Sequence, residues 1–225
     1  IDKKSCSFKK KTTGFGHKFS KFRTVFKRLK NKNKKLNKGK KFIENIIHGK
    51  QKYFYFSSQD KKQFREKVFK KNNKKKVVIY AHSFFDSPHI LGNCIFTDFY
   101  DWLKFLSAVS LETDYDWYIK PHPNYLDENN VIKSFVLEHP HIKYIEPKIR
   151  NLDLVKQGLD YALTVFGSCA AELSYLGVKV VNACINNPHS EYRFSFNPKN
   201  KEDLRRIIKN LPNKKLNFKK EEIYE

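Results

Sequence analysis

Residues 76–211 alternate short apolar runs with amphipathic stretches, a pattern that predicts β-strands and α-helices in turn. The apolar runs predict strands at 77–81, 117–120, 142–145, 161–166 and 178–183. Amphipathic spacing predicts helices at 98–110, 131–138, 152–157, 170–176 and 202–211. In the first of these helices, the apolar residues between Phe99 and Val109 recur on one face. The alternation indicates a Rossmann-like, doubly wound α/β domain with a parallel sheet.

The first third of the chain has little hydrophobic periodicity before Phe42 and carries the excess positive charge. Residues 1–76 hold 28 Lys and Arg against 4 Asp and Glu, whereas residues 77–225 hold 18 against 19. Runs such as 27–35 offer no apolar face to bury. We interpret residues 1–75 as a basic, partly irregular appendage, the remnant of an upstream acceptor domain or a linker from it. Residues 212–225 are interpreted as a C-terminal tail.

A basic segment of this kind can bind nucleic acid, anionic lipid headgroups or an acidic polymer by non-specific electrostatics. An alternative explanation is codon bias, because the chain uses far more Lys than Arg and is rich in Asn, Ile, Phe and Tyr. Codon bias explains which cation is used. It does not explain why the excess lies at one end.

Cysteine usage and missing motifs exclude several classes. Cys6, Cys94, Cys169 and Cys184 are scattered with no C-x-x-C pair, so neither a zinc site nor a disulfide framework is expected. We therefore expect a reducing, cytoplasmic location. The absence of GxGxxG, Walker A, HExxH and GxSxG motifs disfavours NAD enzymes, kinases, zincins and serine hydrolases.

No apolar run approaches the roughly 18–20 residues that a membrane span needs, and no signal-peptide core precedes a cleavage site. Any contact with a membrane is therefore expected at its surface. The chain contains no methionine and begins at Ile1, so we take it to be a piece of a longer protein.

Polar side chains gather in the loops that follow the predicted strands. In open α/β sheets, ligands bind at the carboxyl ends of the strands, so these loops are the places to inspect. They hold His82, Ser83, Asp86 and His89 after the first strand, His122 after the second, Gly167 and Ser168 after the fourth, and His189 and Ser190 after the fifth. Several histidines on one predicted edge indicate a ligand site more strongly than any one of them alone.

The glycine-serine turn after the fourth strand predicts a phosphate-binding site. Gly167 permits a tight turn, and Ser168 suits the N-cap of a helix. A helix that begins near Cys169 leaves backbone N–H groups unpaired at its start, where an anion is favoured. Glu172 lies one turn inside, where a carboxylate can accept hydrogen bonds from ribose hydroxyls. The alternative is an ordinary βα turn followed by an exposed glutamate.

The segment Lys120-Pro-His-Pro123 is stiff, because prolines on both sides of His122 fix the backbone and aim the imidazole. An aimed imidazole can donate a hydrogen bond to a phosphate or stabilise a leaving phosphate. The alternative is a proline-rich strand exit with a solvated histidine.

Two further loops carry weaker candidates. Asp86 is the only carboxylate in its loop and is the candidate general base, unless it merely caps the backbone of a turn. His189 and Ser190 could contact a base or sugar, whereas Phe194 and Phe196 beyond them are equally suited to the core. The pair Asp114 and Asp116 precedes a strand at the opposite edge and is expected to be structural.

Four segments then carry a family resemblance: VVIYAHSFFD at 77–86, FYDWL at 99–103, WYIKPHPN at 117–124 and GSCAAELSYLG at 167–177. Together they resemble the carboxyl-terminal, donor-binding half of GT-B glycosyltransferases. Among these, the chain is most similar to capsule and lipopolysaccharide polysaccharide biosynthesis proteins. The resemblance spans about residues 76–211 and excludes the basic segment.

The resemblance implies a nucleotide-sugar donor, CMP- or UDP-linked, held by this half, with no catalytic metal and no cofactor. An upstream half would bind the acceptor and often supplies the base in inverting members. Glu172 matches the glutamate that holds ribose in many GT-B enzymes. His122-Pro123 is similar to the phosphate-contacting His-Pro motif of bacterial sialyltransferases and to a motif in CDP-glycerol-dependent transferases. Gly167-Ser168 departs from the Ser-Ser pair of sialyltransferases.

The sequence thus predicts a glycosyltransferase fragment that extends a capsular or lipopolysaccharide glycan, or a lipid-linked acceptor, at the cytoplasmic membrane face. Glu172 would bind ribose. The turn from Gly167 to Ala170 would bind phosphate together with His122. The 82–89 loop would contact phosphate and sugar. The basic segment would lie toward anionic lipid or the acceptor.

Two rival functions stay open. A nucleotide-sugar epimerase or a CDP-alcohol phosphotransferase would have the same fold. A basic nucleic-acid-binding protein is a rival from another class, although specific nucleic-acid binding is not expected. The basic segment interleaves aromatic residues only at 53–56, unlike single-strand-binding platforms.

Overall fold

A computed structural model describes residues 22–48, 50, 66–84, 94–123 and 129–225. Its centre is a six-stranded sheet, parallel throughout, with the order β3-β2-β1-β4-β5-β6. The strands are β1 (Lys75–Tyr80), β2 (Tyr115–Lys120), β3 (Ile142–Tyr144), β4 (Tyr161–Thr164), β5 (Lys179–Asn182) and β6 (Ser195–Phe196). This is the Rossmann order, in which the direction of winding reverses between β1 and β4. The predicted fold class is confirmed.

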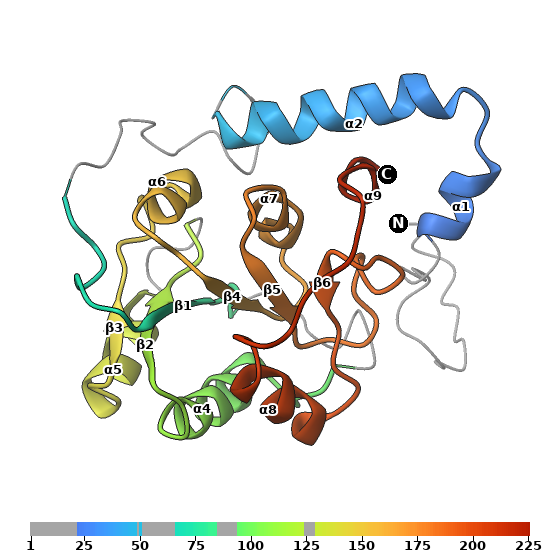
Figure 1. The fold of residues 1–225 in the computed structure, drawn as a ribbon. Helices are drawn as coiled ribbons and strands as arrows, with labels where there is room; N and C mark the ends of the chain where they lie inside the picture. The colour runs from blue at the N-terminus through green and yellow to red at the C-terminus, as the bar shows by residue number, and fades with distance from the viewer. Residues whose placement is uncertain (1–21, 49, 51–65, 85–93, 124–128) are drawn as a thin grey trace, which may run out of the picture.

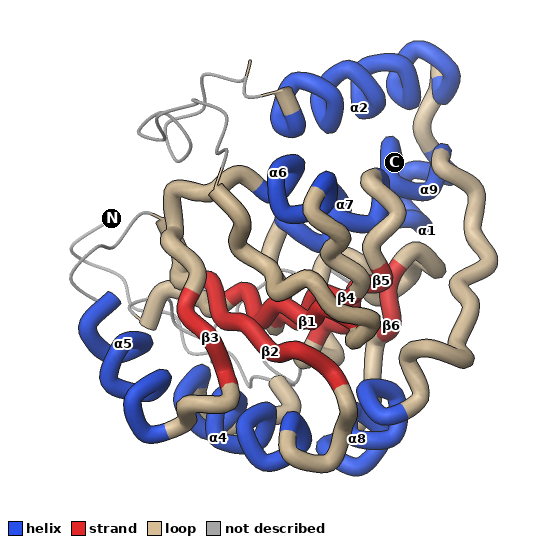
Figure 2. The backbone as a smooth tube through the Cα atoms, turned by 60° about the vertical axis from the view of Figure 1, so that its left-hand side comes forward, coloured by secondary structure: helices blue, strands red, loops and turns tan. Residues whose placement is uncertain are grey.

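Helices cover both faces of the sheet (Figures 1 and 2). One face is covered by α4 (Phe99–Ser110), α5 (Asn129–Glu138) and α8 (Lys201–Lys209). The other is covered by α6 (Asn151–Lys156) and α7 (Cys169–Tyr175). Among the described residues, no helix is long and apolar enough to cross a membrane.

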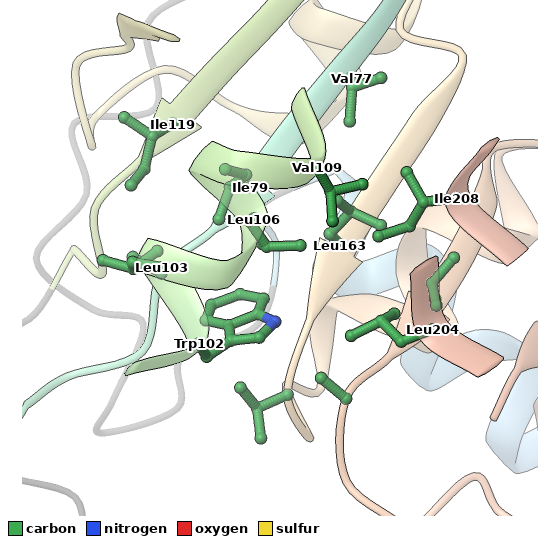
Figure 3. Packing of buried hydrophobic residues seen from close by; sticks show 14 of the residues in the cluster. Val77, Ile79, Trp102, Leu103, Leu106, Val109, Ile119, Leu163, Leu204 and Ile208 are labelled. Atoms are coloured by element: carbon green, nitrogen blue, oxygen red, sulfur yellow. The ribbon is translucent and has the colours of Figure 1, made fainter. Parts of the chain in front are cut away.

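The core consists of two layers, one on each side of the sheet. Along β1, Val77 and Ile79 belong to the layer under α4, α5 and α8, whereas Val78 and Tyr80 belong to the layer under α6 and α7. Strands buried on both faces read as continuous apolar runs, which is why periodicity located them. Figure 3 shows the first layer, in which Trp102 of α4, only 1% exposed, packs beside neighbouring apolar side chains.

The predicted strands and helices all occur, with small shifts at their ends. Asp98 caps α4 by accepting a hydrogen bond from the Asp101 backbone N–H at 2.7 Å.

The strand β2 begins two residues before its apolar run, because Tyr115 and Asp116 still pair with β1. Asp116 forms an ion pair with Lys76 at 2.9 Å, at the amino ends of the strands and therefore away from the predicted ligand edge. The two-residue strand β6 was not predicted.

The N-terminal segment contains two helices, α1 (Phe22–Arg28) and α2 (Lys32–Ile47), and α2 lies over α7 and α9 (Glu221–Tyr224) (Figure 1). Ile43 and Ile47 are buried in a cluster with Ile223. Helix α2 packs against α7 and α9, and the division of the chain at residue 75 stays a prediction. The lysines of α2 are exposed, in keeping with the weak periodicity of this region.

A close approach of two backbones fixes α2 on α9. A Cβ atom at Gly39 would overlap the carbonyl oxygen of Tyr224, so a residue without a side chain is needed there. Farther along the helix, the Tyr175 hydroxyl donates to the Glu44 carboxylate at 3.3 Å. The position of α2 therefore depends on the C-terminal tail and on α7.

Candidate functional site

A cavity of about 430 Å³ opens at the carboxyl ends of β1, β2 and β4, on the side of the sheet that α6 and α7 cover. Its volume lies within the range of small-molecule sites, about 300–1,000 Å³. The carboxyl ends of the strands contribute Tyr80, Ala81, His82, Thr164 and the β2 exit from Lys120 to Pro123. The segments that lead into α6 and α7, with the first residues of these helices, contribute Ile149 to Asn151, Phe166 to Cys169 and Glu172. Helix α2 contributes Phe42, Ile43, Ile46 and Ile47. The cavity thus lies beside the point where the sheet reverses its winding.

The turn between β4 and α7 requires its glycine. A Cβ atom at Gly167 would lie 2.7 Å from Thr164 Oγ1 and 3.1 Å from Cys169 Sγ, closer than side chains tolerate. The Gly167 N–H donates to Thr164 Oγ1 at 3.3 Å, which ties the turn to the end of β4. Ser168 occupies the N-cap position of α7, but its side chain makes no capping hydrogen bond. Its hydroxyl lines the cavity instead.

His82 supports this turn through its ring nitrogen. Its Nε2 lies 3.3 Å from the backbone nitrogens of both Val165 and Phe166, which donate to it, and 3.1 Å from Thr164 Oγ1. Because Nε2 accepts, the ring proton of the neutral imidazole belongs on Nδ1. Burial, together with the nearby His122, lowers the pKa of His82 to about 3. The imidazole is therefore neutral, and its Nε2 is not available as a donor to phosphate.

Lys120 and Glu172 place opposite charges in the cavity. The Lys120 ammonium donates to the Pro147 carbonyl at 2.9 Å, and burial lowers its pKa to about 8. Glu172 Oε2 accepts from Asn151 Nδ2 at 2.9 Å. Burial raises the pKa of Glu172, whereas the Asn151 hydrogen bond and the Lys120 charge act to lower it. The pair offers a cation and an acceptor to the same ligand.

Tyr80 brings a polar group with no partner among the described residues. Its hydroxyl is buried and makes no hydrogen bond there, and burial raises its pKa well above 10.0. A buried hydroxyl left unpaired is costly, so such a group in a cavity indicates that a ligand or water completes it.

Arg150 adds a second cation at the rim. Its guanidinium donates to the Asp153 carboxylate from Nε at 2.8 Å and from Nη2 at 2.6 Å, which fixes its orientation beside the cavity. Together with Lys120, it makes the loop side of the cavity favourable for an anion.

The structure brings six of the eleven predicted site residues together at the cavity and places four others outside its lining. His82, His122, Gly167, Ser168, Cys169 and Glu172 line the cavity. Ser83 and Ala170 are buried behind it, and His189 and Ser190 lie in the loop after β5, outside its lining. Asp86, the candidate base, lies outside the described residues, as does His89.

The loop after β5 contacts the turn without lining the cavity. Burial lowers the pKa of His189 to about 4. A hydrogen bond to the Gly167 backbone acts in the opposite direction but has the smaller effect. His189 Nε2 and Ser190 Oγ are buried and make no hydrogen bond within the described part of the chain. Phe194 is 2% exposed and belongs to the core, and Phe196 packs against the core.

Sequence reasoning missed Tyr80, Lys120, Asn151 and the α2 residues. Lys120 and Tyr80 end their strands at the ligand edge, a position that would have suggested them. The signal for α2 is the apolar quartet of Phe42, Ile43, Ile46 and Ile47, in which i and i+4 neighbours share one helical face. Cys169 lines the cavity as a half-buried residue, and desolvation of its thiol raises the pKa to about 12, so it is not a reactive thiolate. The described residues hold no group of three or more metal-ligating side chains.

No protein-family model and no curated protein matches this sequence. Among solved structures, the chain is similar to the beta Kdo 2,4 transferase KpsC of Thermosulfurimonas dismutans, with a TM-score of 0.55 and 15% identity over 89% of this chain and 58% of that chain. At this identity, the likeness shows the fold alone, a Rossmann-like half of the GT-B type. The chain spans little more than half the length of that transferase.

Two UDP-GlcNAc 2-epimerase structures are more distant. The enzyme from Neisseria meningitidis, bound to UDP-GlcNAc, has a TM-score of 0.46 and 17% identity over 66% of this chain and 41% of that chain. The enzyme from Methanocaldococcus jannaschii, in complex with UDP-GlcNAc and UDP, has a TM-score of 0.43 and 16% identity over 91% of this chain and 49% of that chain.

Proposed function

We propose that this chain is the nucleotide-sugar-binding half of a glycosyltransferase. The observation that carries the proposal is the composition of the cavity, which combines the Glu172 carboxylate, the buried Lys120 ammonium and the tight Gly167 turn. A nucleotide presents hydroxyls and an anionic phosphate in one molecule. A carboxylate suits the hydroxyls, and a cation beside a turn suits the phosphate.

In this proposal, Glu172 accepts hydrogen bonds from the ribose while Asn151 holds the carboxylate in place. Lys120 has one of its three N–H donors on Pro147, which leaves two for a phosphate oxygen. His122 and Ser168, both on the cavity lining, are further donors for the phosphates. His82 acts indirectly, because its Nε2 holds the backbone of the turn.

The chemistry that follows is transfer of the sugar to a glycan or lipid-linked acceptor. The nucleoside phosphate leaves with the electron pair of the glycosidic bond, and the Lys120 ammonium stabilises the charge that develops on it. The fold likeness to a Kdo transferase supports a sugar-transfer reaction. The match covers 58% of that transferase, and we propose that a further half binds the acceptor. We place the catalytic base in that half or in the loop that contains Asp86.

The exposed lysines of α2 support the further proposal that this side faces anionic lipid at a cytoplasmic membrane surface, or the acceptor polymer. No resident metal or cofactor is part of the proposal. The donor is a CMP- or UDP-linked sugar and is consumed as a substrate.

The test is a thermal-shift screen of the 225-residue chain with CMP, CDP, UDP and GDP. A nucleotide at 100 times its Kd stabilises the native state by about 2.7 kcal/mol, enough to raise the midpoint by several degrees. The nucleotide that shifts the midpoint then identifies the sugar donors to incubate with the enzyme joined to its acceptor half. Free nucleotide and an extended glycan support transfer. An isomerised sugar nucleotide would instead identify an epimerase and overturn the proposal.

A further inference from the structure

Helix α2 adds an apolar wall to a cavity that also holds charged groups. Phe42, Ile43, Ile46 and Ile47 all line the cavity, but they differ in burial. Ile43 and Ile47 are 7% and 5% exposed and pack against the C-terminal tail, whereas Phe42 is 40% exposed. The wall therefore carries one aromatic side chain that lines the cavity and stays partly exposed.

The same cavity carries the charged residues Lys120, Arg150 and Glu172. A nucleotide has the same division, with a planar base at one end and an anionic phosphate at the other. Aromatic side chains stack on bases of every kind, because each base offers a π-face. In the proposed function the charged residues take the phosphate and ribose, so the apolar residues of α2 are the part of the lining suited to the base.

We propose that Phe42 stacks on the base of the bound nucleotide, so that the N-terminal segment completes the donor pocket from outside the Rossmann domain. This inference rests on the proposed function, because it needs a nucleotide in the cavity. Gly39 against Tyr224 and Glu44 against Tyr175 hold α2 in place for this contact. The wall is therefore preformed rather than assembled by the ligand.

The test compares Phe42→Ala with Phe42→Tyr and with Phe22→Ala in the 225-residue chain. Phe22 of α1 is a matched control, since it is 46% exposed and lies outside the cavity lining. Calorimetric titration measures the Kd of the nucleotide found by the thermal-shift screen, and of ribose 5-phosphate, which has no base. We expect Phe42→Ala to weaken nucleotide binding about tenfold. The affinity of Phe42→Ala for ribose 5-phosphate should be unchanged. Phe42→Tyr keeps an aromatic ring and should bind the nucleotide as tightly as the wild-type chain.

The outcomes separate this inference from the proposed function. If the wild-type chain binds a nucleotide and Phe42→Ala binds it equally well, the stacking inference is wrong and the proposed function stands. Equal loss of nucleotide and ribose 5-phosphate binding would mean that α2 has moved, which also overturns the stacking role. If the wild-type chain binds no nucleotide, both proposals fail.

A second inference comes from two cysteines that the fold brings together. Cys94, before α4, and Cys184, after β5, form an isolated antiparallel backbone bridge, and their Sγ atoms lie 3.3 Å apart. Cys184 is fully buried and Cys94 half-buried, so only the Cys94 thiol has access to a small reagent. The hydrogen bond between them lowers the pKa of Cys94 below its usual value.

We infer that this pair is an oxidation site that closes to a disulfide with a small-molecule disulfide as the oxidant. The Cys94 thiolate attacks one sulfur of the reagent and releases one thiol, which leaves a mixed disulfide. The Cys184 thiolate then attacks the Cys94 sulfur and releases the second thiol. The two cysteines lose two electrons and two protons, and the reagent gains them.

Incubation with oxidised glutathione, followed by mass spectrometry of proteolytic peptides, tests this inference. We expect a cross-link between the peptides of residues 94 and 184, reversed by dithiothreitol. In Cys184→Ser the reaction should stop at a glutathione adduct on Cys94. Cys169 should stay unmodified in both proteins, because the raised pKa keeps it a thiol. A stable adduct on Cys94 in the wild-type chain, or no reaction at all, would overturn the inference.

Discussion

Lys120 allows a direct physical test of the cavity, because its ammonium group is held away from water. The residue is 6% exposed, and burial lowers its pKa from 10.5 to about 8. Substitution of Lys120 by Met keeps the length of the side chain and removes the titrating group. The difference between the two proteins then isolates the contribution of this one proton to stability.

The sign of the effect follows from which state binds the proton. The unfolded chain keeps a lysine pKa near 10.5, so between pH 8 and 10.5 it holds a proton that the folded state has released. Stability rises with pH wherever the unfolded state binds more protons, by about 1.4 kcal/mol per pH unit for one group. From pH 7 to pH 9.5, the wild-type chain should therefore gain about 2 kcal/mol of unfolding free energy relative to Lys120→Met.

Urea titrations of both proteins at pH 7, 8, 9 and 9.5 measure this difference. A bound nucleotide phosphate would stabilise the charged form of Lys120, so saturating nucleotide should move the rise to higher pH. If the unfolding free energies of the two proteins change equally with pH, the pKa of Lys120 is not lowered by burial, and the predicted difference is wrong.

Three further substitutions test the cavity and its wall. Tyr80→Phe removes a buried hydroxyl that has no partner among the described residues, so stability should be unchanged or higher while nucleotide affinity in calorimetric titration falls about fivefold. Gly39→Ala should lower the unfolding free energy in urea by about 1–3 kcal/mol, because the new Cβ overlaps the Tyr224 carbonyl. Gly167→Ala should weaken nucleotide binding, also measured by calorimetry, because its Cβ would lie 2.7 Å from Thr164 Oγ1 and push the turn away.

Equal nucleotide affinities of Gly167→Ala and the wild-type chain would contradict the need for glycine in the turn. A stability loss of 1 kcal/mol or more in Tyr80→Phe would mean that the hydroxyl is paired. For Gly39, the control is the exposed neighbour Lys38→Ala, and equal stabilities of the two variants would contradict the close approach. For Gly167, combination with Thr164→Ala removes the clashing oxygen and should restore part of the affinity.

Periodicity located β1 to β5 because their residues are buried on both faces, and it located α4 because one face is apolar and Asp98 caps it. It did not find β6, which is only two residues long. It also missed α2, whose six lysines hide an apolar quartet. Two members of that quartet, Ile43 and Ile47, are buried because the C-terminal tail, more than 170 residues later, packs against them.

The ligand edge was predictable, but the roles on it were not. His82 and His122 were expected together on one edge, and both line the cavity. The sequence does not show that His82 Nε2 accepts from the backbone of the turn, because that depends on where β4 ends relative to β1. Nor does it show that Cys94 and Cys184 meet, since a parallel sheet brings together residues that are far apart in sequence.

Nucleotide binding in the cavity beside β1 and β4 is the property on which the proposed function depends. Calorimetric titration of CMP, CDP, UDP and GDP into the wild-type chain and into Glu172→Ala tests it most directly. We predict that one of the four binds the wild-type chain with a measurable Kd. In Glu172→Ala the affinity should fall at least tenfold, while the 2′,3′-dideoxy form of the same nucleotide should bind both proteins equally. Binding of that nucleotide to Glu172→Ala with unchanged affinity would contradict the account.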